Sequence, residues 1–531
     1  MGDAILYWND IALEANRVSH SNGAGEQTGP TLSARALGII HLAMYDAYIG
    51  AAKASGQATD THYLNPAKFV PAAKAGASPE TAIAAAAYTT LCDLFPSQKA
   101  FFDLIYDESY APVGVTAAAA KDGYAFGKTV GKAMLKERMG DPGAASLKYK
   151  PKYERGKHRQ DPDNPAQSFH GPEYGTAKLF ASKVRHTLAP PPQPSTGAGE
   201  YRRALRQVRG KGIAPELMGT VSPEGRRRTE NETIIGVYWG YDGALGLGTP
   251  PRLYNQIVRL VAENTDNPAN AAKPAGQRRN TLAQNARLFA LVNAAMADAG
   301  ILAWEVKYRD EFWRPVVGIR EHHTSMGAPP TTGSDDIGDD GDPGWLPLGA
   351  PFTNQLGKNF TPPFPAYPSG HATFGAAAFH MTRRFYGIAA NNRQADTLFN
   401  NLTFVSEELN GQNRDNKGAV RPRHVRAFPG GLWQMIVENG LSRVYLGVHW
   451  SFDAFAVTND NSGIVPDVDK KVIGKHIGGV PLGILIANDI FDDSKLVAAS
   501  AAPAPVVTEA AALEEEIAPV VEASRLPWPL G

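Results

Sequence analysis

Three short motifs in the second half of the 531-residue chain combine residue types that bind a compact oxyanion. Between them they supply three cationic side chains, a hydroxyl group next to a glycine amide, two imidazoles and a carboxylate. Cations and amides donate hydrogen bonds to the oxygens of such an anion, and an imidazole nitrogen can hold its central atom from one side. In chain order the residues are Lys307, Arg314, Ser369, Gly370, His371, Arg443, His449 and Asp453.

The first motif places Lys307 and Arg314 seven residues apart, which is two turns of an α-helix. This spacing predicts that both cations project from one helix face. Pro315 is expected to end or kink the helix directly after Arg314, because proline lacks a backbone donor and restricts the residue before it. Taken alone, the pair fits an exposed, charged helix surface at least as well.

The second motif follows a proline-rich stretch and opens an apolar helical pattern. Ser369 is a natural N-cap for that helix, whose first amides point outward and carry partial positive charge. Gly370 has no side chain to keep an anion away from the backbone, and His371 follows it directly. The alternative is an ordinary helix cap beside a surface histidine.

In the third motif, Asp453 follows His449 by four residues, so the two share a face if the segment is helical. The carboxylate could then hydrogen-bond one imidazole nitrogen and leave the other free as a ligand or nucleophile. Gly447 predicts a local break between Arg443 and His449. A solvent-exposed Asp453 is the alternative.

The elements that must position these motifs are predominantly helical. Segments 139–175 and 186–200 are rich in glycine, proline and polar residues and indicate surface connections. We expect an N-terminal helical lobe over 1–215, a C-terminal helical lobe over 216–496 that carries the motifs, and a low-complexity tail over 497–531 that is disordered or binds a partner. The predicted helices cover about 31–53, 78–94, 117–138, 228–241, 250–264, 279–299, 301–313, 370–386 and 430–445.

Residues 321–368 form a long segment rich in glycine, proline and aspartate that runs directly into the second motif. Loops of this length in compact domains are usually functional or disordered, and here a channel wall or lid is favoured. The acidic stretch 335–342 lacks the spaced glutamate of an EF-hand loop and is expected to be solvated. Gly127-Lys128-Thr129 resembles the end of a phosphate-binding loop, but Gly123 is one residue too close to it, so nucleotide binding is not expected.

The composition of the chain limits which partners and which cellular location it can be expected to have. The chain has 53 basic and 53 acidic residues, so its formal net charge is zero, and no global charge favours nucleic acid or an anionic membrane. No run of about 18 apolar residues predicts a membrane-spanning helix. The chain has a single cysteine, Cys92, and its start lacks the pattern of a secretory signal. These features leave the location open and slightly favour the cytoplasm over export.

The three motifs, in this order, resemble those of the vanadium-dependent haloperoxidases, which share their anion pocket with the type 2 phosphatidic acid phosphatase superfamily. The resemblance covers about residues 230–460 in motif detail. It implies an all-α protein of two helical bundles, with the active site at the end of the C-terminal four-helix bundle. It also implies vanadate as the cofactor, with no haem, flavin or nucleotide, and assembly into homo-oligomers.

The same resemblance assigns a role to each motif residue. His449 is implied to be the axial vanadium ligand, and His371 the acid/base beside the apical oxygen. The other implied anion-binding groups are Lys307, Arg314, Ser369, Gly370 and Arg443, with Asp453 supporting His449.

Three further residues match positions known in the family. Trp304 and Phe364 are implied to wall the halide site, with plain core packing as the alternative. Asp242, within Tyr241-Asp242-Gly243, is implied to pair with Arg443. Algal members limited to bromide tend to carry histidine at the Phe364 position, so phenylalanine favours a chloroperoxidase-like pocket.

The implied reaction uses hydrogen peroxide to oxidise bromide, with chloride and iodide as further candidates, to hypohalous acid that halogenates a small organic acceptor. The alternative is an acid phosphatase that uses the same pocket, with a phosphohistidine at His449 and His371 as the general acid. The motifs cannot separate the two, because vanadate mimics the transition state of phosphoryl transfer. The chain length, Trp304, Phe364 and the segment around Asp242 favour the haloperoxidase.

Overall fold

The protein is all-α. The computed structural model describes residues 3–58, 60–65, 71–143, 149–194, 199–221, 227–322, 326, 340–457, 464–493 and 496. Within these residues the strands are two residues long and pair only as antiparallel couples: β1 Thr403–Phe404 with β2 Arg426–Ala427, β3 Ala456–Val457 with β4 Pro466–Asp467, and β5 Lys471–Val472 with β6 Lys475–His476. Short 3₁₀ segments lie at Pro96–Gln98, Tyr174–Thr176, Pro215–Thr220, Pro268–Asn270 and Glu407–Leu409.

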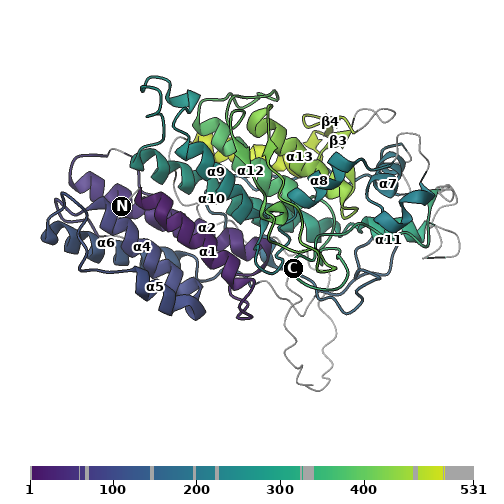
Figure 1. The fold of residues 1–531 in the computed structure, drawn as a ribbon, viewed down its shortest axis with the longest axis horizontal. Coiled ribbons are helices and arrows are strands. Elements are labelled where there is room, and N and C mark those ends of the chain that lie inside the picture. Colours follow the sequence, from purple (N-terminus) through teal and green to yellow (C-terminus); the bar gives the residue numbers. More distant parts are fainter. Residues whose placement is uncertain are drawn as a thin grey trace, which may run out of the picture.

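The N-terminal helices gather at one end of the molecule, purple to blue in Figure 1. They are α1 Ala4–Ser19, α2 Gly29–Ala54, α4 Pro79–Leu94, α5 Lys99–Ile105 and α6 Ala117–Glu137. Ser78 caps α4 by accepting the backbone N–H of Thr81, as the sequence predicts. Helices α4 and α6 approach closely through glycine: a Cβ at Gly127 would lie 2.1 Å from the carbonyl oxygen of Ala82. The glycine before Lys128 therefore serves helix packing.

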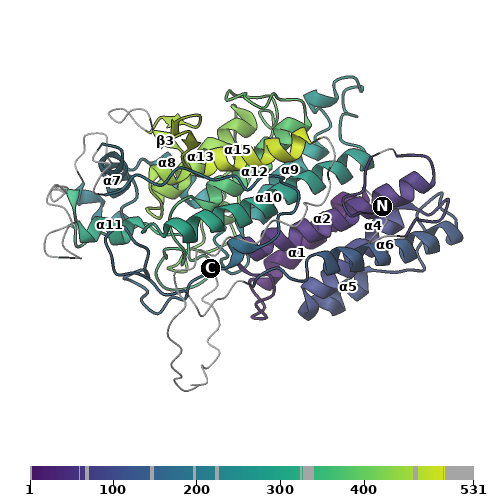
Figure 2. The ribbon, with the colours of Figure 1, turned by 180° about the vertical axis from the view of Figure 1, so that it is seen from behind.

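The remaining helices carry the three motifs and lie around α10, which runs through the middle of both views (Figures 1 and 2). Helix α10 packs against α2 on one side and against α12 and α15 on the other, so one hydrophobic core joins the two ends of the molecule. These helices are α7 Glu200–Lys211, α8 Glu230–Tyr238, α9 Pro250–Glu263, α10 Leu282–Asp310, α11 Pro315–Glu321, α12 Gly370–Phe385, α13 Gly431–Tyr445, α14 Ser451–Ala454 and α15 Gly479–Asp492.

Helix α10 corrects one prediction. The sequence predicted two helices, 279–299 and 301–313, divided near Gly300, whereas the structure has one continuous helix of 29 residues. Gly300 is a contact position rather than a break: a Cβ there would lie 3.2 Å from the Phe374 ring. By length and composition α10 could also cross a membrane, which the sequence did not predict, but 94% of its most apolar window is buried within the protein.

The other predictions of secondary structure and domains have mixed outcomes. Helices α8, α9, α12 and α13 lie where the sequence predicted them, to within a few residues, whereas α1, α7 and α15 were not predicted. The division of the chain at residue 215 stays a prediction. The tail 497–531, and all of 335–342 except residues 340–342, lie outside the described residues.

Candidate active site

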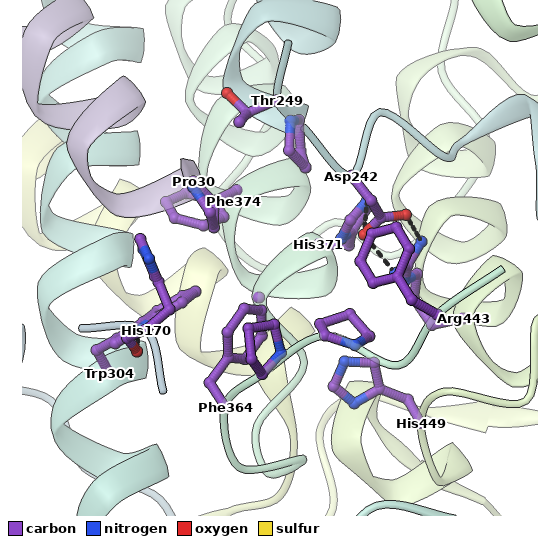
Figure 3. A pocket seen from close by; sticks show the side chains of 15 residues that line it. Pro30, His170, Asp242, Thr249, Trp304, Phe364, His371, Phe374, Arg443 and His449 are labelled. Carbon is purple, nitrogen blue, oxygen red and sulfur yellow. Dashed lines mark hydrogen bonds and ion pairs between the residues drawn. The ribbon is translucent and has the colours of Figure 1, made fainter. Parts of the chain in front are cut away.

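Residues of the second and third motifs line one pocket near the C-terminal end of α10 and the N-terminal end of α12 (Figure 3). Lys307 and Arg314 of the first motif lie beside it, next to the Phe364 ring of its lining. Asp242, His371 and Arg443 lie on one side of this pocket, and Trp304 and His170 on the other. The segment 360–364, which the sequence predicted to be part of a channel wall, contributes to its lining. Residues 323–325 and 327–339 of the same predicted loop lie outside the described residues.

Lys307 projects from the last turns of α10 and is fully buried. Its ammonium group donates to the carbonyl oxygens of Pro365, at 2.7 Å, and Ala366, at 3.0 Å. An ammonium group has three donors, so one remains for a ligand. Burial, reinforced by the nearby charge of Arg314, holds the pKa of Lys307 well below its usual value. A bound anion would stabilise the charged form of this lysine.

Arg314 does not share a helix with Lys307, contrary to the prediction. Helix α10 ends at Asp310, because Glu311 adopts a left-handed backbone conformation with φ of 49°. Arg314 is instead the N-cap of the next helix, α11, with Pro315 in its first turn. The two cations therefore converge from the ends of two helices.

The Arg314 guanidinium is fixed on three sides. Nε donates to the carbonyl oxygen of Phe364 at 2.9 Å, and Nη1 donates to that of Val448 at 2.7 Å and to Nε2 of His449 at 2.9 Å. Nη2 is buried and has no hydrogen-bond partner in the described part of the chain. Burial lowers the pKa of Arg314 to about 9.

Arg443 and Asp242 form a two-pronged ion pair, as the resemblance implied. Nη1 and Nη2 of Arg443 donate to the two carboxylate oxygens of Asp242 at 2.9 and 2.7 Å. This parallel arrangement fixes the plane of the guanidinium. Nε of Arg443 is buried and, among the described residues, has no partner.

The hydrogen bonds of His449 define its tautomer. A guanidinium can only donate, so Nε2 of His449, 2.9 Å from Arg314, must be unprotonated. The proton therefore lies on Nδ1, which donates to Asp453 at 2.7 Å. Burial and the surrounding cations hold the pKa of His449 well below its usual value, and burial raises that of Asp453 to about 7. Nε2 is thus unprotonated, and its electron pair accepts a hydrogen bond from Arg314.

Gly447 provides the break that the sequence predicted ahead of His449. Its φ is 75°, and a Cβ there would lie 2.4 Å from the carbonyl oxygen of Gly212. Because this position requires glycine, the chain can leave α13 and turn His449 back toward the pocket.

His371 lies in the first turn of α12 and is buried. Its Nε2 donates to the carbonyl oxygen of Gly240 at 2.7 Å and lies 3.9 Å from Asp242. In the neutral ring the electron pair is therefore on Nδ1. Burial first, and the charge of Arg443 second, lower the pKa of His371 to about 4, so the ring is neutral at pH 7.

Ser369 caps α12 as predicted, because its hydroxyl accepts the backbone N–H of Ala372. A Cβ at Gly370 would lie 3.4 Å from the Trp304 ring. Gly370 lines the pocket next to this ring.

Aromatic rings wall the other side of the pocket. The centroids of Trp304 and Phe364 lie 4.8 Å apart, and the Lys307 ammonium lies 5.0 Å from the centroid of Phe364. Trp304 is also part of the core, so its packing and lining roles coexist.

Sequence reasoning missed the contribution of His170 to this wall. Its Nε2 lies 3.0 Å from the Thr31 hydroxyl on α2, and a Cβ at Gly29 would lie 2.3 Å from its ring. His170 lies in an irregular segment and is not part of a recognisable motif. Its role in the lining becomes visible only in the structure, where α2 borders the pocket.

The residues present fit a tetrahedral oxyanion. Three cations face the pocket against two carboxylates, Asp242 and Asp453. Buried polar groups are normally hydrogen-bonded. Nη2 of Arg314 and Nε of Arg443 are buried, yet neither has a hydrogen-bond partner among the described residues. An anion with several oxygens would satisfy both donors, and Nε2 of His449 could hold its central atom.

Comparisons with known proteins agree with this geometry. The family model for the vanadium chloroperoxidase N-terminal domain matches residues 2–171, and that for the second helical-bundle domain of the same enzymes matches residues 287–464. The chain is 37% identical to the vanadium chloroperoxidase of Curvularia inaequalis over 574 aligned positions, which cover 92% of this chain and 89% of that protein.

Solved structures show the same fold. A bacterial vanadium-dependent iodoperoxidase matches with a TM-score of 0.58 and 17% identity, over 91% of this chain and 95% of its own. The holo form of a bacterial vanadium-dependent chloroperoxidase matches with a TM-score of 0.54 and 15% identity, over 88% and 93%. At these identities the solved structures support the fold alone. The family models and the Curvularia relative establish which family the chain belongs to. The chain belongs to the vanadium chloroperoxidase family of vanadium-dependent haloperoxidases.

Proposed function

We propose that the pocket binds vanadate and that the protein uses hydrogen peroxide to oxidise bromide, with chloride and iodide as further substrates, to hypohalous acid that halogenates a small organic acceptor. When bound, vanadate supplies a Lewis-acid centre that makes hydrogen peroxide electrophilic toward halide. Family membership supports this cofactor and these reactants.

One observation carries the proposal: an unprotonated imidazole nitrogen and two unsatisfied guanidinium donors share one buried pocket. Nε2 of His449 is the proposed vanadium ligand, because it is unprotonated and its other nitrogen is anchored by Asp453. The anion would replace Arg314 as the partner of this nitrogen. Nη2 of Arg314 and Nε of Arg443 are the proposed donors to the oxygens of the anion. Lys307 adds its third donor, and the Ser369 hydroxyl and Gly370 amide add two more.

His371 is the proposed acid/base group. Its Nε2 is committed to the Gly240 carbonyl, so Nδ1 is the atom that accepts a proton from hydrogen peroxide. Because the ring is neutral at pH 7, it is ready to act as a base. The adjacent anion and Asp242 favour the protonated ring that results.

Trp304 and Phe364 are the proposed wall of the halide site. They present apolar rings beside Lys307 and Arg314, whose charged groups lie 5.0 Å from the Phe364 centroid. A halide held between these cations and apolar rings would lose much of its water, which increases its nucleophilicity. Phenylalanine at this position supports chloride as well as bromide oxidation.

The same geometry also suits a second reaction. An unprotonated Nε2 surrounded by cations can attack a phosphate ester to form a phosphohistidine, with His371 as the proton donor to the leaving group. Acid phosphatase activity is therefore the rival function of this pocket.

A single experiment separates the two functions. Metal-stripped protein is assayed for bromination of a phenol dye with hydrogen peroxide and bromide, before and after orthovanadate is added. Activity that requires vanadate and decreases when phosphate competes supports the haloperoxidase. Absence of bromination, with hydrolysis of p-nitrophenyl phosphate that vanadate inhibits, would assign the pocket to phosphatase chemistry.

A further inference from the structure

A second cavity, of about 460 Å³, lies among the N-terminal helices, between α1, α4, the segment 105–113 and α6. Leu282, the first residue of α10, is at its edge. Lys307 lies about 37 Å further along the same helix, at about 1.5 Å per residue. The cavity is therefore separate from the oxyanion pocket, although its volume suits a small organic ligand.

Aromatic rings turned at steep angles to one another form the walls of this cavity. The rings of Tyr7 and Trp8 are perpendicular, with centroids 5.5 Å apart. Trp8 meets Tyr106 at 68° and 6.4 Å, and Tyr106 meets Tyr124 at 88° and 5.7 Å. The cavity is partly open to solvent and walled by these rings, and ring faces attract cations.

The charge of the lining has one sign. Asp3, Glu80 and Asp107 line the cavity, and among the described residues its lining includes no lysine, arginine or histidine. Asp3 is held by the backbone N–H groups of Ile5 and Leu6, and burial still raises its pKa. A cation in the cavity would offset the cost of burying this carboxylate.

The apolar part of the lining further defines the ligand. Apolar surface, which would not bind a hydrated metal ion, comes from Ala84, Ile105, Val113 and Leu282. Methyl groups on a nitrogen would contact this surface and the ring faces at once.

We propose that this cavity binds a small organic cation with a quaternary ammonium head group. The rings of Tyr7, Trp8 and Tyr106 contact the methyl groups, and Asp3 and Glu80 supply the opposite charge. This binding is independent of the oxyanion pocket and of the function proposed for it.

Isothermal titration calorimetry of the full-length protein tests the proposal with two probes of the same shape. Choline carries the quaternary charge, and 3,3-dimethylbutan-1-ol replaces the charged nitrogen by carbon. We expect choline to bind about tenfold more tightly or better, because attraction between a cation and aromatic faces grows where water is excluded. Equal affinities, or no heat with choline, would overturn the proposal.

Variants then test whether choline binds in this cavity. Tyr7 is 37% exposed at the rim, so Tyr7→Leu should preserve the fold and weaken choline binding about fivefold, as should Glu80→Gln. Trp8 is 4% exposed, and its replacement risks the fold. Glu216→Gln, in the 3₁₀ segment Pro215–Thr220, is the matched control and should bind choline as the parent does. Unchanged affinity in both Tyr7→Leu and Glu80→Gln would remove the site from this cavity.

Discussion

Asp453 accepts the Nδ1–H of His449 over 2.7 Å, and the same carboxylate oxygen accepts the backbone N–H of Trp450 over 3.0 Å. The carboxylate is thus anchored at the start of α14 while it orients an imidazole that precedes the helix. This relationship fixes both the tautomer and the direction of His449 before any ligand arrives, which reduces the cost of binding.

Replacing His449 by alanine should abolish vanadate retention and halide oxidation while the fold persists. The imidazole supplies the proposed ligand nitrogen, and the surrounding cations cannot replace a coordinate bond. Vanadium retained after desalting, bromination rate and circular dichroism would be measured together. His424→Ala, a histidine outside the pocket lining, serves as the control. Full activity in His449→Ala would refute its role as ligand.

Asp453→Asn should weaken vanadate binding about tenfold to a hundredfold, the usual loss when the partner of a ligating histidine is changed. The amide keeps the shape but loses the negative charge that strengthens Nδ1–H donation and the basicity of Nε2. Titration of the apoprotein with vanadate, read as recovered bromination, measures the affinity. An unchanged dissociation constant would show that the carboxylate only supports the backbone.

The sequence identified the residues of the site better than the elements that carry them. Lys307, His371, Arg443 and His449 stand out because their types and spacing suit one ligand. The structure places the last three in one pocket and Lys307 beside its Phe364 wall. Arg314 was placed on the wrong element, because the stop of α10 is a left-handed Glu311. A non-glycine residue in that conformation leaves no reliable local signal.

Tertiary contacts account for the other failures of sequence reasoning. Gly300 looks like a break in isolation, but it admits the Phe374 ring against a continuous helix. Helix α15 contains Gly479 and Gly483, which disfavour a helix locally, yet a Cβ at Gly483 would lie 2.4 Å from the Thr373 carbonyl oxygen on α12. Close packing against α12 therefore outweighs the local preference.

Asp242→Asn should shift the acid limb of the activity profile to lower pH. The charge of Asp242 raises the pKa of His371, while Arg443 lowers it, so removing the carboxylate lowers that pKa further from about 4. His371 must be unprotonated to accept a proton, so activity is lost as pH decreases through its pKa. The shift would be measured from the bromination rates of parent and variant between about pH 3 and 7, the range in which His371 titrates. A shift toward higher pH would contradict the assignment.

Phe364→His should weaken chloride oxidation relative to bromide oxidation. The phenyl ring packs 4.8 Å from Trp304 and lies beside two cations, so a polar ring would admit water to the halide. Chloride is the more strongly hydrated ion and the harder to oxidise, so it should lose more. The ratio of kcat/KM for the two halides is the measurement, with Phe360→His as a control elsewhere in the lining. An unchanged ratio would exclude Phe364 as a determinant of halide range.

His371→Ala should retain vanadate but lose about 10²- to 10⁴-fold in rate, which is typical for removal of an acid/base group. We expect the two effects to separate, because the proposed anion-binding groups are the three cations and His449, whereas Nε2 of His371 is bonded to the Gly240 carbonyl. His371→Gln is the companion variant, since its amide can still donate to the Gly240 carbonyl but cannot accept a proton at neutral pH. If His371 acts on protons, both variants should retain stoichiometric vanadium and both should be slow. Recovery of the rate in His371→Gln would mean that the contact with Gly240 matters more than proton transfer, and loss of vanadium from both would make His371 an anion-binding residue.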